Sequence, residues 1–213
     1  MNLNLFTNCT DTCLSNPTIF KTLDSFKQTF GEAEISIYLD PNPNRNLLQA
    51  YSELIYRTLG VKPTITSGLA DGYMKSLLMG KSKYIFQLEH DWTFQNITHS
   101  SNEIIEIMER DNLWFMLFNK HPNNGQLNGT KWQSYFTSTN RDYCLTDRIS
   151  NNPHIINREY YLKNIAPKIN WTAKGAGQIE QVLQKSGLEC AVYGKYSLPP
   201  TVKHLNGRKG GLK

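Results

Sequence analysis

Short apolar runs and amphipathic stretches alternate along the first ninety residues of the chain. Apolar or β-branched runs at residues 3–7, 33–39, 62–66 and 84–88 predict four strands. Between them, apolar residues recur three or four positions apart, which is the spacing of a helix with one buried face. Helices are therefore predicted after Asn16-Pro17, after the capping residue Asn44, and over residues 67–79.

This alternation predicts the fold class. Parallel strands joined by helices need right-handed crossovers, which place helices on both faces of the sheet. We expect an α/β protein with a Rossmann-like, mainly parallel sheet sandwiched between helices. The 213 residues are enough for one such domain, and the hydrophobic fraction of 39% is ordinary for a globular core.

The second half of the chain alternates less regularly. The pattern predicts helices from Asn102, over 158–163 and over 175–186, and strands at 113–118, 154–156 and 188–193. Residues 121–131 are rich in turn formers, and residues 135–145 mix strand and loop character. We expect irregular loops carried on a scaffold here, which is where binding specificity usually resides.

The stretch from Tyr84 to Phe94 carries the strongest chemical signal. A predicted buried strand ends abruptly at Glu89-His90-Asp91. The two carboxylates are two positions apart, so in an extended chain they point to the same side and repel each other. A divalent cation with oxygen ligands would neutralise them. Two solvated acids at a strand end are the alternative.

Polar residues also follow the first two predicted strands. Thr7, Asn8 and Thr10 come after the first strand, and Asp40 comes after the second. The carboxyl ends of parallel strands meet at one edge of a sheet, where open α/β sheets bind their ligands. The sequence therefore predicts a ligand site at this edge.

Charge and composition limit the partners. The net charge of +5 is dispersed, without a basic stripe interleaved with aromatic residues, so an anionic small ligand is expected and a nucleic acid is not. No stretch has the apolar length of a membrane span or the pattern of a signal peptide, so we expect a cytoplasmic protein without stable membrane insertion. The four cysteines lack zinc-binding spacing and are predicted to be reduced core thiols.

Positive charge is concentrated only near the C-terminus, from Lys203 onward. Residues 205–213 are rich in glycine and predict either a linker to further domains or a flexible loop that closes over phosphates. His204, at the start of this tail, would reach a metal or a phosphate in the functional interpretation. In the other interpretation it is an exposed tail histidine.

Residues 67–92, SGLADGYMKSLLMGKSKYIFQLEHDW, combine a polar helix, a small-residue bend, a Tyr-Ile pair and an acidic triplet. This order resembles the nucleotide-sugar half of GT-A glycosyltransferases (nucleotide-diphospho-sugar transferases), with Glu89-His90-Asp91 in the place of the family's Asp-X-Asp. Thr7 and Asn8 after the first predicted strand and Asp40 after the second match the family's positions for the nucleobase and ribose. More narrowly, the chain resembles the N-terminal glycosyltransferase domain of large chlorella-virus enzymes that build capsid glycans.

The resemblance implies a single GT-A glycosyltransferase domain over 1–213, with a nucleotide-sugar-binding half at 1–94 and an acceptor-binding half at 95–213. It implies transfer of a hexose or deoxyhexose from a UDP-sugar to a glycan acceptor, with inversion expected and retention as the alternative. Mn²⁺ or Mg²⁺, held by Asp91, Glu89 and His204, would stabilise the leaving diphosphate. For a viral enzyme the compartment would be the host cytoplasm.

Two departures from the family's pattern affect the assigned residues. Asp71 stands where the family has an arginine before the motif, with Lys75 one turn later, and we assign both to the donor site. The family's Glu-Asp pair before the last helix, which often provides the catalytic base, is replaced by Gly-Ala-Gly-Gln-Ile-Glu at 175–180. Glu180 is therefore the first choice for the base and Asp147 the second.

Two other classes of protein remain as alternatives. A nucleotidyltransferase also needs a nucleotide site and metal-binding acids, but it normally has a glycine-rich loop after the first strand, and residues 7–16, TNCTDTCLSN, contain no glycine. A nucleotide- or glycan-binding module that has lost catalysis is the other alternative, because the motif's first acid is Glu and the Glu-Asp pair is absent. Metal-dependent hydrolysis of a sugar nucleotide would separate an enzyme from such a module.

Overall fold

The computed structural model describes residues 1–123, 136–147, 149–172 and 177–205. Its helices are α1 (Thr18–Phe30), α2 (Arg45–Leu59), α3 (Leu69–Met79), α4 (Ser101–Arg110), α5 (Arg158–Asn164), the 3₁₀-helix η1 (Ala166–Lys168) and α6 (Gly177–Lys185). Its strands are β1 (Asn2–Thr7), β2 (Glu34–Leu39), β3 (Thr64–Ile65), β4 (Tyr84–Glu89), β5 (Trp92–Phe94), β6 (Phe115–Leu117), β7 (Phe136–Ser138), β8 (Tyr143–Thr146), β9 (His154–Asn157), β10 (Cys190–Tyr193) and β11 (Val202–His204). Most of the predicted turn-rich loop, from residue 124, and the tail from residue 206 lie outside the described residues.

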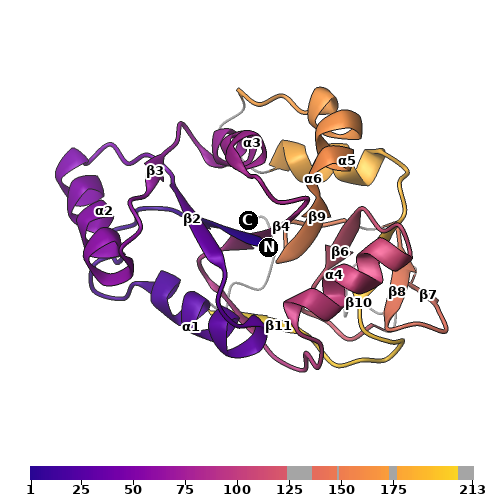
Figure 1. The fold of residues 1–213 in the computed structure, drawn as a ribbon. Helices are drawn as coiled ribbons and strands as arrows, with labels where there is room; N and C mark the ends of the chain where they lie inside the picture. Colours follow the sequence, from indigo (N-terminus) through magenta and orange to yellow (C-terminus); the bar gives the residue numbers. More distant parts are fainter. Residues whose placement is uncertain (124–135, 148, 173–176, 206–213) are drawn as a thin grey trace.

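One nine-stranded sheet, in the order β3-β2-β1-β4-β9-β6-β10-β8-β7, runs through the molecule (Figure 1). The first four strands pair in parallel, as the alternation predicts. The second half of the sheet is mixed, because β9 lies antiparallel between β4 and β6, and β8 and β7 add an antiparallel edge beyond β10. The predicted α/β class is confirmed.

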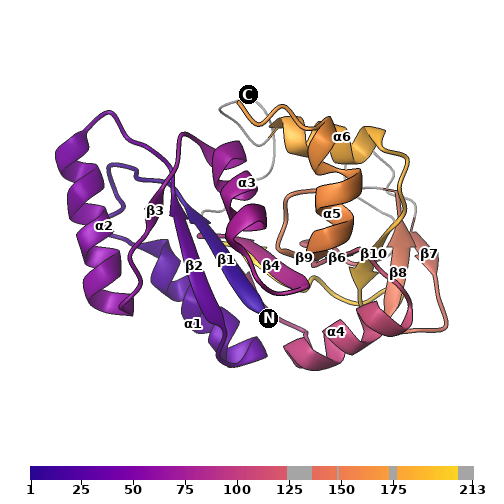
Figure 2. The ribbon, with the colours of Figure 1, turned by 45° about the horizontal axis from the view of Figure 1, so that its top comes forward.

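Helices cover both faces of this sheet (Figure 2). Apolar residues of α1, α2 and α4 pack on one face, where Leu3 and Leu5 of β1 point. Apolar residues of α3, α5 and α6 pack on the other face, where Phe6 points. The side chains of a strand alternate between faces, so β1 contributes to both cores and is fully buried.

Local sequence signals account for several helix boundaries. The Asn44 side chain accepts a hydrogen bond from the backbone N–H of Leu47 at 3.1 Å and caps α2, which ends at Gly60 in the left-handed conformation with φ of 69°. Ser100 and Glu103 form a capping box at the start of α4. The strand predicted at 62–66 is shorter than expected and covers only Thr64–Ile65.

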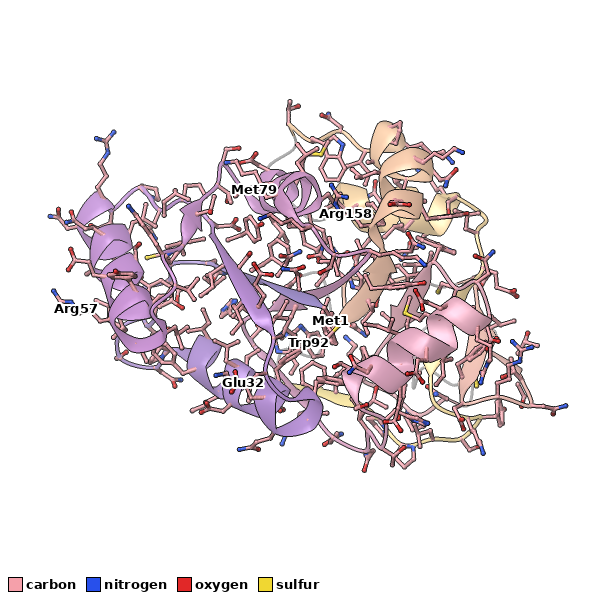
Figure 3. The ribbon with its side chains drawn as sticks, in the orientation of Figure 1. Met1, Glu32, Arg57, Met79, Trp92 and Arg158 are labelled. Atoms are coloured by element: carbon pink, nitrogen blue, oxygen red, sulfur yellow. The ribbon has the colours of Figure 1, made fainter. Side chains whose placement is uncertain are left out.

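A second, two-stranded sheet joins β5 to β11, and the sequence pattern did not predict it. The strands are antiparallel, with Trp92 opposite His204 and Phe94 opposite Val202. His204 therefore lies in a paired strand, which corrects its placement in a tail. Trp92 is buried, and Figure 3 shows it in the interior, whereas Arg57 extends from the periphery.

All four cysteines are buried and form no disulfide, as predicted. Among the described residues, no helix combines the length and the apolar character that crossing a membrane requires.

His154, on the central strand β9, is enclosed by aromatic rings. Its ring stacks on Phe115 with centroids 4.5 Å apart and lies 6.3 Å from the ring of Tyr73. Nδ1 lies 2.7 Å from the Asn152 carbonyl oxygen, to which it donates. Burial disfavours the charged imidazolium and lowers the pKa of His154 from 6.5 to about 4, although the hydrogen bond to Asn152 opposes this.

We expect this histidine to make the protein less stable in mild acid. The unfolded chain takes up a proton near pH 6.5, whereas the folded protein resists protonation of His154 down to about pH 4. Its contribution to stability is thus complete above pH 6.5 and is lost as the pH falls toward 4, by about 2 kcal/mol at pH 5. Urea unfolding of wild type and His154→Gln, measured above pH 6.5 and at pH 5, should show a smaller loss of unfolding free energy in the variant. Equal losses of unfolding free energy in wild type and variant would contradict the lowered pKa of His154.

Candidate functional site

The acidic triplet lies at the edge of the sheet where β1, β2 and β4 end, here called the carboxyl edge. Strand β4 ends at Glu89, and a turn follows at His90 and Asp91. Strand alternation therefore stops before Asp91, and it does not determine how the carboxylates of Glu89 and Asp91 are oriented relative to each other. They line different cavities, which have Asn8 and His90 in common.

Two remote segments hold this turn. The hydroxyl of Thr22, on α1, donates to the His90 carbonyl oxygen at 2.6 Å. The backbone N–H of Leu205, just after β11, donates to the Asp91 carbonyl oxygen at 2.7 Å. Both carbonyls of the turn are therefore fixed by the tertiary structure rather than by local sequence.

Asp91 and His204 face each other across the β5–β11 pairing. His204 Nε2 lies 3.1 Å from Asp91 Oδ2, and the indole of Trp92 meets the imidazole edge-on, with centroids 4.8 Å apart. This is the distance of a direct contact between the two side chains, and two neighbouring ligands of an octahedral ion at 2.0–2.1 Å would also be about 3 Å apart. Glu89 does not complete the set, since the described residues contain no group of three or more His, Cys, Asp or Glu that could hold a metal.

The larger cavity, here called the Asp91 cavity, has a volume of about 390 Å³. It is lined by Asn8, Thr10, Thr12, Cys13, Asn16, Pro17, Thr18, Tyr51, His90 and Asp91. Its wall includes the amino end of α1, which no described side chain caps. Backbone N–H groups at such an end attract anions. The cavity is thus polar, combining a carboxylate with an anion-favouring helix end.

The smaller cavity, here called the Asp40 cavity, has a volume of about 50 Å³ and includes Thr7, Asn8, Asp40 and Glu89 in its wall. The structure thus brings together the three residues assigned to the nucleobase and ribose. Asp40 accepts a hydrogen bond from the Thr66 hydroxyl at 3.0 Å. Burial raises the pKa of Asp40, the hydrogen bond opposes this, and the charge of Asp71 adds to it.

Glu89 is surrounded by other carboxylates. Its pKa is raised to about 8, first by burial and then by the charges of Asp91, Glu180 and Asp40. Three other assigned acids, from three parts of the chain, thus lie close enough to act on Glu89. Glu180, near the start of α6, accepts a hydrogen bond from the backbone N–H of Asn151 at 2.8 Å.

Asp71 and Lys75 form an ion pair. Lys75 Nζ lies 2.7 Å from Asp71 Oδ2, which also accepts from the backbone N–H of Ser67 at 2.8 Å. Burial raises the pKa of Asp71, but the bonds from Lys75 and Ser67 outweigh it and leave that pKa below its ordinary value. Neither residue lines the Asp91 or the Asp40 cavity.

Asp147 lies apart from these acids. It follows β8, whose last residue Thr146 pairs with Cys190, the first residue of β10. That end of β10 is opposite the carboxyl edge, and β8 is separated from β4 by three strands, which is a lateral distance of about 19 Å. The structure does not bring Asp147 to the other assigned residues.

Several residues of the site carried no assignment from the sequence. His90 lines both cavities, and burial lowers its pKa although the charge of Asp91 opposes this. Tyr51, on α2, lines the Asp91 cavity and lies 3.0 Å, oxygen to oxygen, from the Thr7 hydroxyl. His90 was recognisable from its position inside the acidic triplet. Tyr51 was not, because its contact joins positions 44 residues apart.

No protein-family model matches the chain, and no curated protein matches its sequence. Solved structures share its fold. The structure of S. aureus TarS 1–349 in complex with UDP superposes with a TM-score of 0.57 at 13% identity, covering 95% of this chain and 60% of that one. The TarS complex with UDP-GlcNAc gives a TM-score of 0.57 at 10% identity, covering 97% and 61%.

A CMP:2-keto-3-deoxy-manno-octonic acid synthetase complexed with CTP is also similar, with a TM-score of 0.57 at 12% identity, covering 94% of this chain and 92% of that one. The chain thus spans about three fifths of the TarS chain and nearly all of the synthetase. At these identities the likeness establishes the fold. It is an α/β fold found in complexes with UDP, UDP-GlcNAc and CTP.

We expect the Thr22 hydroxyl to be needed for the stability of the turn at His90 and Asp91. Thr22→Val keeps the shape of the side chain but leaves the His90 carbonyl without its donor, which should cost about 1–2 kcal/mol in free energy of unfolding. Thr29→Val is the matched control, because the Thr29 hydroxyl bonds only a carbonyl within its own helix, at 2.8 Å. Urea unfolding that shows the same loss for both variants would contradict this role.

Proposed function

We propose that the chain is a metal-dependent glycosyltransferase that moves a hexose or deoxyhexose from a UDP-sugar to a glycan acceptor with inversion. The observation that carries the proposal is the Asp91–His204 pair, 3.1 Å apart, beside a polar cavity of about 390 Å³. That volume lies within the roughly 300–1,000 Å³ of small-molecule sites. The same fold holds UDP and UDP-GlcNAc in the TarS structures, which supports a uridine donor.

Asp91 and His204 would hold Mn²⁺ or Mg²⁺, with oxygen atoms of the diphosphate and water as the other ligands. The bound cation would stabilise the charge that develops on the leaving diphosphate. The protein's own part is to fix the two ligands, through the β5–β11 pairing and the hydrogen bond from Leu205 to the Asp91 carbonyl. The uncapped amino end of α1 faces the same cavity and favours the diphosphate.

Asn8, Asp40 and Thr7, which line the Asp40 cavity, would contact the base and ribose of the donor. Glu89, with a pKa of about 8, is mainly protonated at neutral pH and can donate a hydrogen bond to a ribose or sugar hydroxyl. Asp71 and Lys75 belong to the surrounding frame, since the loop at Ser67 that Asp71 fixes follows Thr66, the partner of Asp40. Asp71 and Lys75 would support the site without contacting the donor.

Glu180 would act as the base that deprotonates the acceptor hydroxyl. Its Oε1 atom accepts from the N–H of Asn151, and its charge acts on Glu89, which supports a position beside the donor end of the site. Asp147 is too far from the carboxyl edge to serve as the alternative base.

The acceptor and the setting of the reaction follow the narrower resemblance to chlorella-virus enzymes. The acceptor would be a capsid glycan in the host cytoplasm, and further domains would follow this chain.

We expect the protein to bind UDP at least about 10-fold more tightly with Mn²⁺ than with chelator, because the cation links Asp91 and His204 to the diphosphate. Asp91→Asn and His204→Asn should each abolish this gain in calorimetry. Asp24→Asn, on the exposed face of α1, is the charge-matched control and should keep it. Equal affinity with and without chelator in wild type would refute the metal-dependent site.

Replacing Glu180 should separate catalysis from donor binding. Glu180→Gln keeps an oxygen to accept from Asn151 but removes the basic group, so transfer to a glycan acceptor should fall by about 10²–10⁴-fold while UDP binding persists. Transfer assays and calorimetry on the same preparation provide both readouts. Unchanged transfer would exclude Glu180 as the base and favour a retaining reaction.

A nucleotidyltransferase is the second candidate function, favoured by one observation. The chain covers 92% of the CTP-complexed synthetase but only 60% of TarS. The loop after β1 has no glycine to wrap a triphosphate, which weighs against this candidate. Incubation with CTP and a keto-sugar acid should release no pyrophosphate, whereas a UDP-sugar with Mn²⁺ should be hydrolysed slowly to UDP. The opposite result would reverse the order of the candidates.

A further inference from the structure

A third cavity, of about 240 Å³, lies between the loop that follows β5 and the end of β10. We call it the Asp142 cavity, and it shares no lining residue with the Asp91 or the Asp40 cavity. Its lining residues are Asn96, Thr98, His99, Asp142, Tyr193, Gly194, Lys195 and Leu198. Tyr193 is the last residue of β10. This strand runs in the direction of β4, because it is parallel to β6, and both β6 and β4 are antiparallel to β9. The Asp142 cavity therefore also lies at the carboxyl edge.

Tyr193 orients the imidazole of His99. The Tyr193 side chain is only 2% exposed, and its oxygen accepts from the backbone N–H groups of Thr98 at 3.1 Å and His99 at 3.2 Å. The same oxygen lies 2.8 Å from His99 Nδ1. The Thr98 hydroxyl also lies 3.2 Å from this oxygen. With the N–H groups occupying the oxygen's lone pairs, a phenol proton directed to Nδ1 leaves the imidazole proton on Nε2, where His99 can donate to a ligand.

The charged groups of the cavity lie near one another but form no short hydrogen bonds with one another. His99 Nε2 lies 3.8 Å from one oxygen of Asp142, and Lys195 Nζ lies 3.5 Å from the other. These separations are too long for strong hydrogen bonds, and exposed ion pairs of this kind add little to stability. The buried Tyr193 contacts therefore hold His99 toward a carboxylate that can still accept hydrogen bonds from a ligand.

The lining chemistry selects the class of ligand. Asp142 and Lys195 carry opposite charges, so the cavity favours neither an anion nor a cation. Carboxylate, imidazole N–H, ammonium and carboxamide groups together accept from and donate to hydroxyl groups. Leu198 supplies an apolar surface, and the volume is below the roughly 300–1,000 Å³ of drug-sized sites. One sugar ring, which is neutral and rich in hydroxyl groups, fits these properties.

We propose that the Asp142 cavity binds one sugar residue of the glycan acceptor. Asp142 accepts hydrogen bonds from two neighbouring hydroxyl groups, and His99 Nε2 and Lys195 donate to sugar oxygens. The role of this sugar as an acceptor rests on the proposed function, because a sugar bound at the carboxyl edge is an acceptor only if a donor is bound there too. Sugar binding by itself does not depend on that function.

The test is saturation-transfer NMR with the methyl glycosides of glucose, galactose, mannose, xylose, fucose and N-acetylglucosamine at millimolar concentration. At least one glycoside should bind wild type, and Asp142→Asn and His99→Gln should each weaken its affinity by about 10-fold or more. Asp24→Asn, whose side chain is exposed on α1, should bind it as wild type does. Thermal unfolding of each variant checks that the fold is kept.

The outcomes separate this inference from the proposed function. No binding of any of the six glycosides to wild type, or equal binding by wild type and Asp142→Asn, overturns the sugar site whatever the donor results are. Calorimetry of wild type with UDP and Mn²⁺ reports on the donor site alone. Sugar binding that depends on Asp142, together with no binding of UDP, would support the cavity as a sugar site and reject the glycosyltransferase.

Discussion

The antiparallel pairing of β5 with β11 is the interaction on which the candidate site depends. Each strand has only three residues, yet the pairing joins residues 92–94 to residues 202–204 and sets His204 opposite Trp92. It brings an imidazole to Asp91 from more than a hundred positions away. Closing so long a loop costs entropy, so the pairing relies on the rest of the fold to bring its ends together.

The connection from β10 to β11 provides that support and also links the cavities. Asn123 donates to the carbonyl oxygens of Tyr193 and Gly194 at 2.9 and 3.1 Å, and the Thr201 N–H donates to the Asn119 carbonyl at 2.8 Å. The connection begins at the wall of the Asp142 cavity and ends beside Asp91. One segment thus fixes a wall of the proposed sugar site and a ligand of the proposed metal site.

The fold could be predicted from the sequence where periodic patterns are long. The first four strands and three helices followed from hydrophobic spacing, and the meeting of Thr7, Asn8 and Asp40 in one cavity followed from their positions after neighbouring parallel strands. The expectation for Glu89 and Asp91 from their two-residue spacing does not apply, because β4 ends at Glu89 and alternation does not continue through a turn.

What the sequence could not predict was set by contacts between remote segments. Strands of three residues, such as β5 and β11, are too short to show a period, so His204 seemed to belong to a tail. Tyr51 and Thr22 look like ordinary residues of amphipathic helices, and only the tertiary structure places them against Thr7 and the His90 carbonyl. Asp147 has the right chemistry, but the antiparallel direction of β8 places it at the wrong end of the sheet.

The most direct test of the central claim is a crystal structure of the protein with UDP and Mn²⁺, recorded with anomalous data at the manganese edge. We predict one manganese peak within bonding distance of Asp91 and His204 Nε2, with oxygen atoms of the UDP diphosphate among its other ligands. A manganese peak elsewhere, or UDP bound at the carboxyl edge with no metal at this pair, would contradict the account.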